Sequence, residues 1–96
     1  MEIRNIRHKG LKNFVEKNDA KGLPADRVRR ISQIVAFLLD MTDIDEFFNL
    51  QKWHAHLLSG DRDGVYSLMV SGNWRITFAY DASDDEIYDL DFEDYH

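Results

Sequence analysis

The sequence predicts an α+β domain in which an N-terminal strand and a two-helix hairpin pack on a twisted antiparallel sheet. Its hydrophobic residues recur at helical spacing up to about residue 41 and alternate with polar residues from about residue 65. Turn-forming residues at 71–73 and 81–85 divide the alternating part into three segments. Helices followed by a run of strands are typical of α+β folds, and the 96 residues suffice for the single domain, residues 1–96, that we expect.

The N-terminal part predicts a short strand and a first helix. Residues 2–8 are few and alternate imperfectly, which indicates an edge strand. From Gly10 onward the apolar residues follow at helical spacing, and they are Leu11, Phe14 and Val15. The turn-forming sequence NDAKG at 18–22 predicts the end of this helix.

A second helix is predicted over about 24–41. Pro24 suits its first turn, where the missing N–H group would have no helical partner in any case. One apolar stripe runs along the segment and consists of Val28, Ile31, Ile34, Val35, Leu38 and Leu39. A further helical turn at 43–50 is expected to place three side chains in the core, namely Phe47, Phe48 and Leu50.

Three strands are predicted at 65–70, 74–80 and 86–93. In the second strand, alternation gives a helix-facing set of Trp74, Ile76, Phe78 and Tyr80 and an outward set of Arg75 and Thr77. In the third strand, the helix-facing set is Tyr88, Leu90 and Phe92 and the outward set is Asp89, Asp91 and Glu93. We therefore expect a sheet with one face on the helices and one polar, open face.

The composition favours a cytoplasmic protein. The chain lacks cysteine, which excludes disulfides and thiolate metal sites and is typical of a reducing compartment. The longest apolar run, VAFLL at 35–39, is too short to span a bilayer, and no basic leader precedes it. We expect neither secretion nor membrane insertion.

The net charge of −6 conceals a difference between two parts of the chain. Residues 1–30 hold nine bases and four acids, whereas residues 31–96 hold three bases and fourteen acids. This asymmetry indicates either a basic face for a nucleic acid or another acidic partner, or simply two solvated faces.

Two arginines are candidates for binding anions. Arg75 lies on the predicted open face, where it either binds an anion or pairs with a cross-strand acid, Asp89 or Asp91. Arg62 lies at the tip of the GDRDG turn at 60–64 and is placed to contact a phosphate, although no helix follows the turn to assist.

Two histidines are candidates for acid–base chemistry. His54 and His56 share a face if residues 53–58 are extended. A metal site needs further ligands, and the remaining imidazoles are the distant His8 and His96, so the sequence predicts no metal site. General acid–base catalysis requires only one or two imidazoles near the reacting group. The alternative is that both histidines are structural or exposed.

Four segments of the chain occur in a recognisable order. They are HKGLKNF at 8–14, HLLSGDRDG at 56–64, SGNWRITF at 71–78 and EDYH at 93–96. Together they resemble the HigB branch of the RelE superfamily of bacterial toxins. The resemblance implies a RelE-like fold and a toxin that enters the ribosomal A site and cleaves mRNA without a cofactor. It also implies a HigA-like helix-turn-helix antitoxin, with operator DNA bound only through the toxin–antitoxin complex.

The resemblance also implies which residues form the active site. Cleavage of RNA by its own 2′-OH group requires a base, an acid and cations that stabilise the phosphate charge. The implied roles are acid and base for His56, Asp94 and His96, base stacking or orientation for Tyr95, and phosphate stabilisation for Arg75.

Two features depart from the family pattern. Leu57 and Ser59 stand where the family often has proline and lysine, and this chain is acidic whereas ribosome-binding relatives are commonly basic. These departures leave open a non-nucleolytic alternative, either a gyrase inhibitor or an antitoxin-bound co-repressor. They also leave open an acidic domain that contacts a basic partner nonspecifically. The EDYH ending favours the nuclease.

Overall fold

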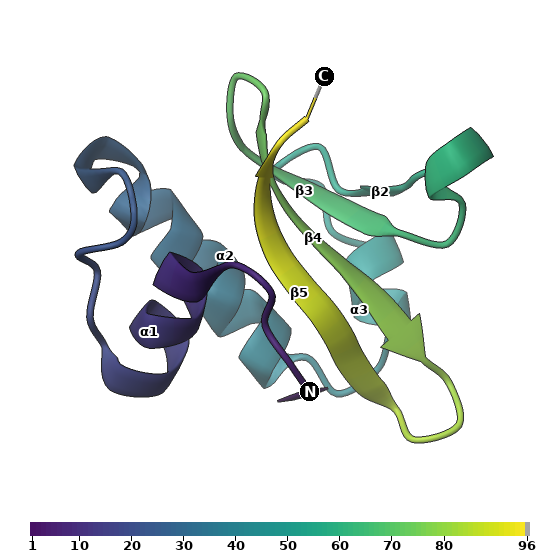
Figure 1. The fold of residues 1–96 in the computed structure, drawn as a ribbon. Coiled ribbons are helices and arrows are strands. Elements are labelled where there is room, and N and C mark those ends of the chain that lie inside the picture. The colour runs from purple at the N-terminus through teal and green to yellow at the C-terminus, as the bar shows by residue number, and fades with distance from the viewer. Residues whose placement is uncertain (96) are drawn as a thin grey trace.

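The helices lie on one face of a five-stranded sheet whose strand order is β1-β5-β4-β3-β2 (Figure 1). The structure, a computed structural model, describes residues 1–95, so the predicted site residue His96 lies outside the described residues. The elements are β1 (Glu2–Ile3), α1 (Lys9–Lys17), the 3-10 turn η1 (Ala25–Arg27), α2 (Val28–Asp40), α3 (Asp45–Phe48), β2 (His56–Leu57), the 3-10 turn η2 (Gly60–Arg62), β3 (Tyr66–Ser71), β4 (Trp74–Asp81) and β5 (Glu86–Asp94).

Four strands form an antiparallel sheet, which the N-terminal strand joins in parallel. β1 pairs with β5, and a single bridge beyond its end joins Ile6 to Leu90. The predicted edge strand is therefore present, but it is regular over two residues rather than over 2–8. The predicted α+β architecture is confirmed, with a sheet that is mixed at this one edge.

Both predicted helices are present, and nearby residues explain their ends. The ring Nδ1 of His8 accepts a hydrogen bond of 3.0 Å from the backbone N–H of Leu11, which caps the N-terminus of α1. Asn18 ends this helix in the left-handed conformation, with a φ of 57°. The second helix is α-helical only from Val28, because the turn that follows Pro24 is a 3-10 turn. No helix within residues 1–95 is long and apolar enough to cross a membrane.

A contact between two glycines fixes the segment that connects α1 to α2. A Cβ atom added to Gly22 would lie 2.6 Å from the Cα of Gly10, and one added to Gly10 would meet the carbonyl oxygen of Gly22. Neither position accepts a side chain without a shift of the backbone, since the two main chains are in direct contact. The contact brings the chain back to the start of α1 before the second helix begins.

The hydrophobic core lies between the helices and one face of the sheet. Its buried side chains are Leu11, Leu23, Ile31, Ile34, Val35, Leu38, Met41, Phe47, Leu68, Val70, Ile76, Phe78, Ile87, Leu90 and Phe92. Two residues predicted for the core are exposed instead, Leu39 at 47% and Phe48 at 54%. Consecutive helical residues point about 100° apart, so each of these lies beside the core residue that precedes it.

An irregularity in β5 reverses the predicted faces near its start. The pairing with β4 shifts register, and Asp89 has a left-handed φ of 50°. Such a bulge inserts an extra residue, so the alternation of side chains changes phase across it. Ile87 is therefore fully buried, whereas Tyr88, which was predicted to face the helices, has its ring 5.2 Å from the guanidinium of Arg4. Beyond the bulge, Leu90 and Phe92 face the core as predicted.

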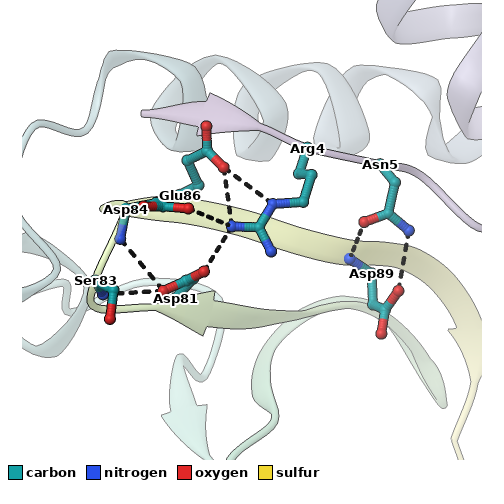
Figure 2. Close-up of polar contacts among 7 residues, drawn as sticks. All are labelled: Arg4, Asn5, Asp81, Ser83, Asp84, Glu86 and Asp89. Atoms are coloured by element: carbon teal, nitrogen blue, oxygen red, sulfur yellow. Dashed lines mark hydrogen bonds and ion pairs between the residues drawn. The ribbon is translucent and has the colours of Figure 1, made fainter.

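The N-terminal segment holds the bulge and the turn that precedes it (Figure 2). The side-chain amide of Asn5 donates to a carboxylate oxygen of Asp89 at 2.9 Å and accepts from the backbone N–H of the same residue at 2.9 Å. Next to it, Arg4 forms ion pairs at the turn between β4 and β5, with Asp81, Asp84 and Glu86. We call this group of four charged residues the turn cluster.

Candidate active site

The open face of the sheet carries two adjacent rows of residues, all of them polar except Met69. Successive Cα partners from β2 to β5 form the first row, which is His56, Ser67, Thr77 and Asp91. The next row is Met69, Arg75 and Glu93. Paired residues of antiparallel strands project to the same side of the sheet. The predicted position of Arg75, Thr77 and Glu93 on one face is therefore confirmed.

His56 has a defined ring orientation at the edge strand β2. Its Nδ1 lies 2.7 Å from the backbone carbonyl oxygen of His54. A carbonyl oxygen only accepts hydrogen bonds, so Nδ1 carries the proton and Nε2 of the neutral ring keeps its lone pair. The extended conformation considered for 53–58 is wrong, because Trp53 and His54 have φ angles of 55° and 48°. The two imidazoles nevertheless lie 5.0 Å apart.

Arg62 forms a bidentate ion pair with Glu93. From the turn η2, its Nη1 and Nη2 donate to the two carboxylate oxygens of Glu93 at 3.1 and 2.8 Å. The hydroxyl of Thr77 donates to the same carboxylate. The sequence made Arg62 a candidate for contacting a phosphate, and two of its nitrogens bind this internal carboxylate.

The surroundings keep Glu93 ionised. Burial is the largest influence and on its own would raise its pKa, but the hydrogen bonds from Arg62 and Thr77 and the charges of Arg62 and Arg7 outweigh it. The pKa of Glu93 is therefore below its ordinary value. The same hydrogen bond raises the pKa of Arg62, which thus stays cationic.

The ring of Tyr95 lies near two guanidinium groups. The central guanidinium carbons of Arg62 and Arg75 are 6.0 and 5.9 Å from the centre of its ring. The backbone N–H of Tyr95 donates to the carbonyl oxygen of Asn73 at 2.7 Å, which holds the end of the chain against the β3–β4 turn. Cation–π contacts of this kind favour a fixed ring between the two charges.

Arg75 is not paired with the acids considered from the sequence. Its Nη1 donates to the backbone carbonyl oxygens of Gly72 and Trp74 at 2.6 and 3.3 Å. Asp89 is bound by Asn5 instead, because the bulge turns it toward the N-terminal segment. The acid directly across from Arg75 is Glu93, whose carboxylate is bound by Arg62.

Two depressions adjoin the Arg62–Glu93 pair. One, of about 560 Å³, is lined by Ser59, Asp61, Arg62, Glu93, Asp94 and Tyr95. The other, of about 350 Å³, lies on the open face and is lined by Arg7, Arg62, Val65, Thr77, Phe78, Ala79, Asp89, Asp91 and Glu93. The first is large enough to receive a nucleotide-sized group, and its lining includes Ser59, which stands where the family often has lysine.

The structure brings together most, but not all, of the predicted site residues. Arg62 and Arg75 both lie near the ring of Tyr95, and Asp94 lines a depression together with Arg62 and Tyr95. His56 lies three strands from β5, which places the two backbones about 14 Å apart. A substrate that contacts both His56 and Asp94 must therefore bind between their side chains.

Sequence reasoning missed Glu93 and Thr77 as members of this site. Alternation placed both on the open face, but it gave no reason to select them among the neighbouring acids and hydroxyls. Thr77 is only 2% exposed, whereas a polar residue on an open face is expected to be accessible to solvent. Among residues 1–95, no group of three or more histidine, cysteine, aspartate or glutamate side chains is arranged to hold a metal ion.

Comparison with known proteins identifies close relatives in sequence. Residues 4–96 match the family described as RelE-like toxin of type II toxin–antitoxin system HigB. The Endoribonuclease HigB of Proteus vulgaris is 43% identical over 94 residues, which cover 98% of this chain and 99% of the relative.

Solved structures share the fold at low sequence identity. The YoeB/ParE toxin from Agrobacterium tumefaciens has a TM-score of 0.57 at 13% identity, with 97% of this chain and 99% of that chain covered. The YoeB–YefM complex from Staphylococcus aureus has a TM-score of 0.55 at 15% identity and coverages of 100% and 97%. The RelBE2 toxin–antitoxin complex from Mycobacterium tuberculosis has a TM-score of 0.51 at 16% identity and coverages of 99% and 96%. The family match, the relative and the shared fold agree: the chain belongs to the HigB family of RelE-like toxins from type II toxin–antitoxin systems.

Proposed function

We propose that this protein is an endoribonuclease that cleaves mRNA in the ribosomal A site and so inhibits translation. The observation that carries the proposal is the convergence of Arg62, Arg75, Tyr95 and Asp94 at one end of the open sheet face. Two cations beside an aromatic ring suit an RNA phosphate next to a stacked base. The 43% identity to a protein named Endoribonuclease HigB supports the same activity.

The reaction is an internal transfer of the phosphate. His56 takes the proton of the 2′-OH group at Nε2, the nitrogen that its bond to the His54 carbonyl leaves with a lone pair. The 2′ oxygen bonds to phosphorus, the bond to the 5′ oxygen breaks, and an acid returns a proton to that oxygen. The products are a 2′,3′-cyclic phosphate and a 5′-OH end, and the step requires neither a metal nor a cofactor.

Asp94 and His96 are proposed as the source of the returned proton. Arg75 and Arg62 stabilise the charge that develops on the phosphate, and such preorganised donors act most strongly in a site that excludes water. Tyr95, fixed between the two arginines, stacks on or orients the base next to the scissile bond.

The basic residues of the first part of the chain supply an RNA-docking surface beside this site. Arg27 donates from Nε to the hydroxyl of Ser71 at 2.8 Å, and Arg30 donates to the carbonyl oxygen of Val70 at 3.2 Å. Both therefore lie at the β3–β4 turn, whose Asn73 holds Tyr95. Local positive charge at this turn offsets the acidic balance of the whole chain, because phosphate contacts are short-ranged at cellular salt.

The partners follow from the family and the proposed reaction. An antitoxin partner accords with the two toxin–antitoxin complexes that share the fold. We propose that it is a HigA-like helix-turn-helix protein, that operator DNA is bound only through this complex, and that the toxin acts in the cytoplasm on ribosomes and mRNA.

The test is a primer-extension map of a reporter mRNA in a reconstituted translation system. New ends within A-site codons should require both ribosomes and wild-type protein, and they should disappear with His96→Ala. Intact mRNA at high protein concentration would refute the nuclease and favour the non-nucleolytic alternative, in which gyrase inhibition or co-repression does not depend on His56 or His96.

A further inference from the structure

We infer that Glu93 is a positioning residue of the nuclease, which holds the guanidinium of Arg62 at the angle needed to contact the scissile phosphate. The inference rests on the proposed function and adds to it a residue outside the set that the family resemblance implies. Its basis is the arrangement of Arg62, Glu93, Thr77 and Tyr95 at the border of the two depressions.

Arg62 needs such a support because it lies in a short turn rather than within a strand. It ends the three-residue turn η2 (Gly60–Arg62), and the glycines on either side of it, Gly60 and Gly64, have φ angles of 69° and 86°. A long arginine side chain on this loop has many rotamers, and each bond that fixes it limits them. The two bonds to Glu93 and the ring of Tyr95 leave one orientation for the guanidinium.

Glu93 is itself firmly held. It lies within β5, its side chain is 25% exposed, and its carboxylate also accepts the hydroxyl hydrogen of Thr77, which is buried in β4. A carboxylate fixed by a strand and a buried hydroxyl does not readily leave for solvent when RNA arrives. It is therefore suited to remain on Arg62 while the substrate is bound.

The pairing leaves Arg62 able to contact a phosphate. A guanidinium has five N–H groups in a planar fork, and the two bonds to Glu93 use one hydrogen from each η nitrogen. The Nε–H group and the outer η hydrogens remain for an anion in the depression that Arg62 shares with Tyr95 and Asp94. The ionised state of Glu93 also argues against a role as the base, because a carboxylate with a lowered pKa is a poor proton acceptor.

The experiment measures ribosome-dependent cleavage by Glu93→Gln against a matched control, Glu86→Gln. Glu86 is the other glutamate of β5 and also binds an arginine, Arg4, but it belongs to the turn cluster. Glutamine keeps the size of the side chain and removes its charge. We expect kcat to fall by about tenfold in Glu93→Gln, because a misplaced charge weakens the transition state, with KM within about threefold of wild type, because Arg62 remains cationic. Glu86→Gln should cleave as wild type does.

Two further variants separate positioning from a general structural effect. Thr77→Val removes the hydroxyl and should lower kcat by about threefold, whereas Thr77→Ser keeps the hydroxyl and should restore most of the rate. In a double-mutant cycle, adding Glu93→Gln to Arg62→Ala should cost nothing beyond Arg62→Ala alone, because Glu93 acts through Arg62. Wild-type or faster cleavage by Glu93→Gln, or additive losses in the cycle, would overturn the inference.

A second readout does not depend on activity. The Nη–Hη hydrogens of Arg62 that bind Glu93 should exchange slowly with solvent in ¹H–¹⁵N spectra of wild type and of Glu86→Gln, and about tenfold faster in Glu93→Gln. An unchanged Arg62 resonance would show that Glu93 does not hold the guanidinium. Lack of any cleavage by the wild-type protein would instead refute the proposed function, and the resonance would still decide whether Glu93 positions Arg62.

Discussion

The two ends of β5 each bind an arginine through a glutamate, yet the two pairs have different surroundings. At the start of the strand, Arg4 binds Glu86 together with Asp81 and Asp84, in the turn cluster shown in Figure 2. At its end, Arg62 binds Glu93, beside the ring of Tyr95 and two depressions.

The difference lies in what each arginine has left to bind. Arg4 joins the N-terminal segment to the β4–β5 turn, and carboxylates surround its guanidinium. Among residues 1–95, Arg62 forms an ion pair with Glu93 alone, and it faces a depression large enough for a nucleotide-sized group. The same chemical pair therefore connects two parts of the fold at one end of the strand and presents a positive charge at the other. We expect variants at the first end to change stability and variants at the second end to change cleavage.

The largest effect on cleavage is expected for His56→Ala. A positioned acid or base contributes about 10²–10⁴-fold to the rate, so kcat should fall by that factor while the fold persists, because His56 lies at an edge strand. The control is His54→Asn, since asparagine tolerates the left-handed backbone at this position and keeps the carbonyl that binds His56. Single-turnover cleavage on programmed ribosomes measures both. Equal losses of kcat in the two variants would show that cleavage depends on the conformation of the segment around residues 54–56 and not on the imidazole of His56.

Gly10→Ala, a substitution among the helices, is the control for a loss of stability that affects neither end of β5 directly. Gly10→Ala should destabilise the fold by about 1–3 kcal/mol, because its Cβ meets the backbone of Gly22. Urea unfolding followed by tryptophan fluorescence gives the change. Cleavage per folded molecule should equal that of wild type. An unchanged free energy of unfolding would contradict the prediction and show that the backbone at Gly22 can shift to accept the Cβ atom.

The comparison itself is tested by Arg4→Ala and Arg62→Ala side by side. Arg62→Ala should lower cleavage by about tenfold, as expected when one cation is lost from a phosphate site, with a small change in Tm. Arg4→Ala should lower Tm, because the N-terminal segment and the β4–β5 turn lose their shared cation, and should leave cleavage per folded molecule unchanged. The reverse assignment of the two effects would contradict the roles given to the two ends.

The smallest expected effect concerns acid stability. The bond from Arg4 lowers the pKa of Asp81, and the bonds from Arg62 and Thr77 lower that of Glu93 against the opposing influence of burial. For a carboxyl whose pKa is lower in the folded state, the unfolded chain binds more protons, so its stabilisation is complete above the unfolded pKa, about 4, and is lost below it.

The stability difference between wild type and Glu93→Gln should therefore shrink as the pH falls from 6 to 3. Because Glu93 is partly exposed, the difference at neutral pH should stay below about 1 kcal/mol. Denaturant unfolding at each pH measures it. A difference that grows on acidification would mean that the charge of Glu93 is unfavourable in the folded state.

Some features of the site followed from sequence and others did not. Alternation placed Arg75 and Thr77 on the open face. The ordered motifs identified the family, and the resemblance implied that Tyr95 and Asp94 are site residues. The partner of Arg62 was not predictable, because Glu93 lies 31 positions further along the chain and the segment between them includes two strands whose register must be known first. The tautomer of His56 depends on its bond to the His54 carbonyl, and this bond forms where Trp53 and His54 are left-handed. Neither residue is a glycine, so sequence alone does not predict this conformation.

The types of the elements, their order and the family follow from sequence alone, because periodicity and local motifs depend on neighbouring residues. The tertiary structure decided which residues face the core around the bulge at Asp89, the parallel pairing of β1, and the exposure of Phe48. It also decided that Arg62 is held by Glu93 beside Tyr95. These features depend on strand register and on contacts between segments far apart in the chain, which are fixed only when the whole sheet has formed.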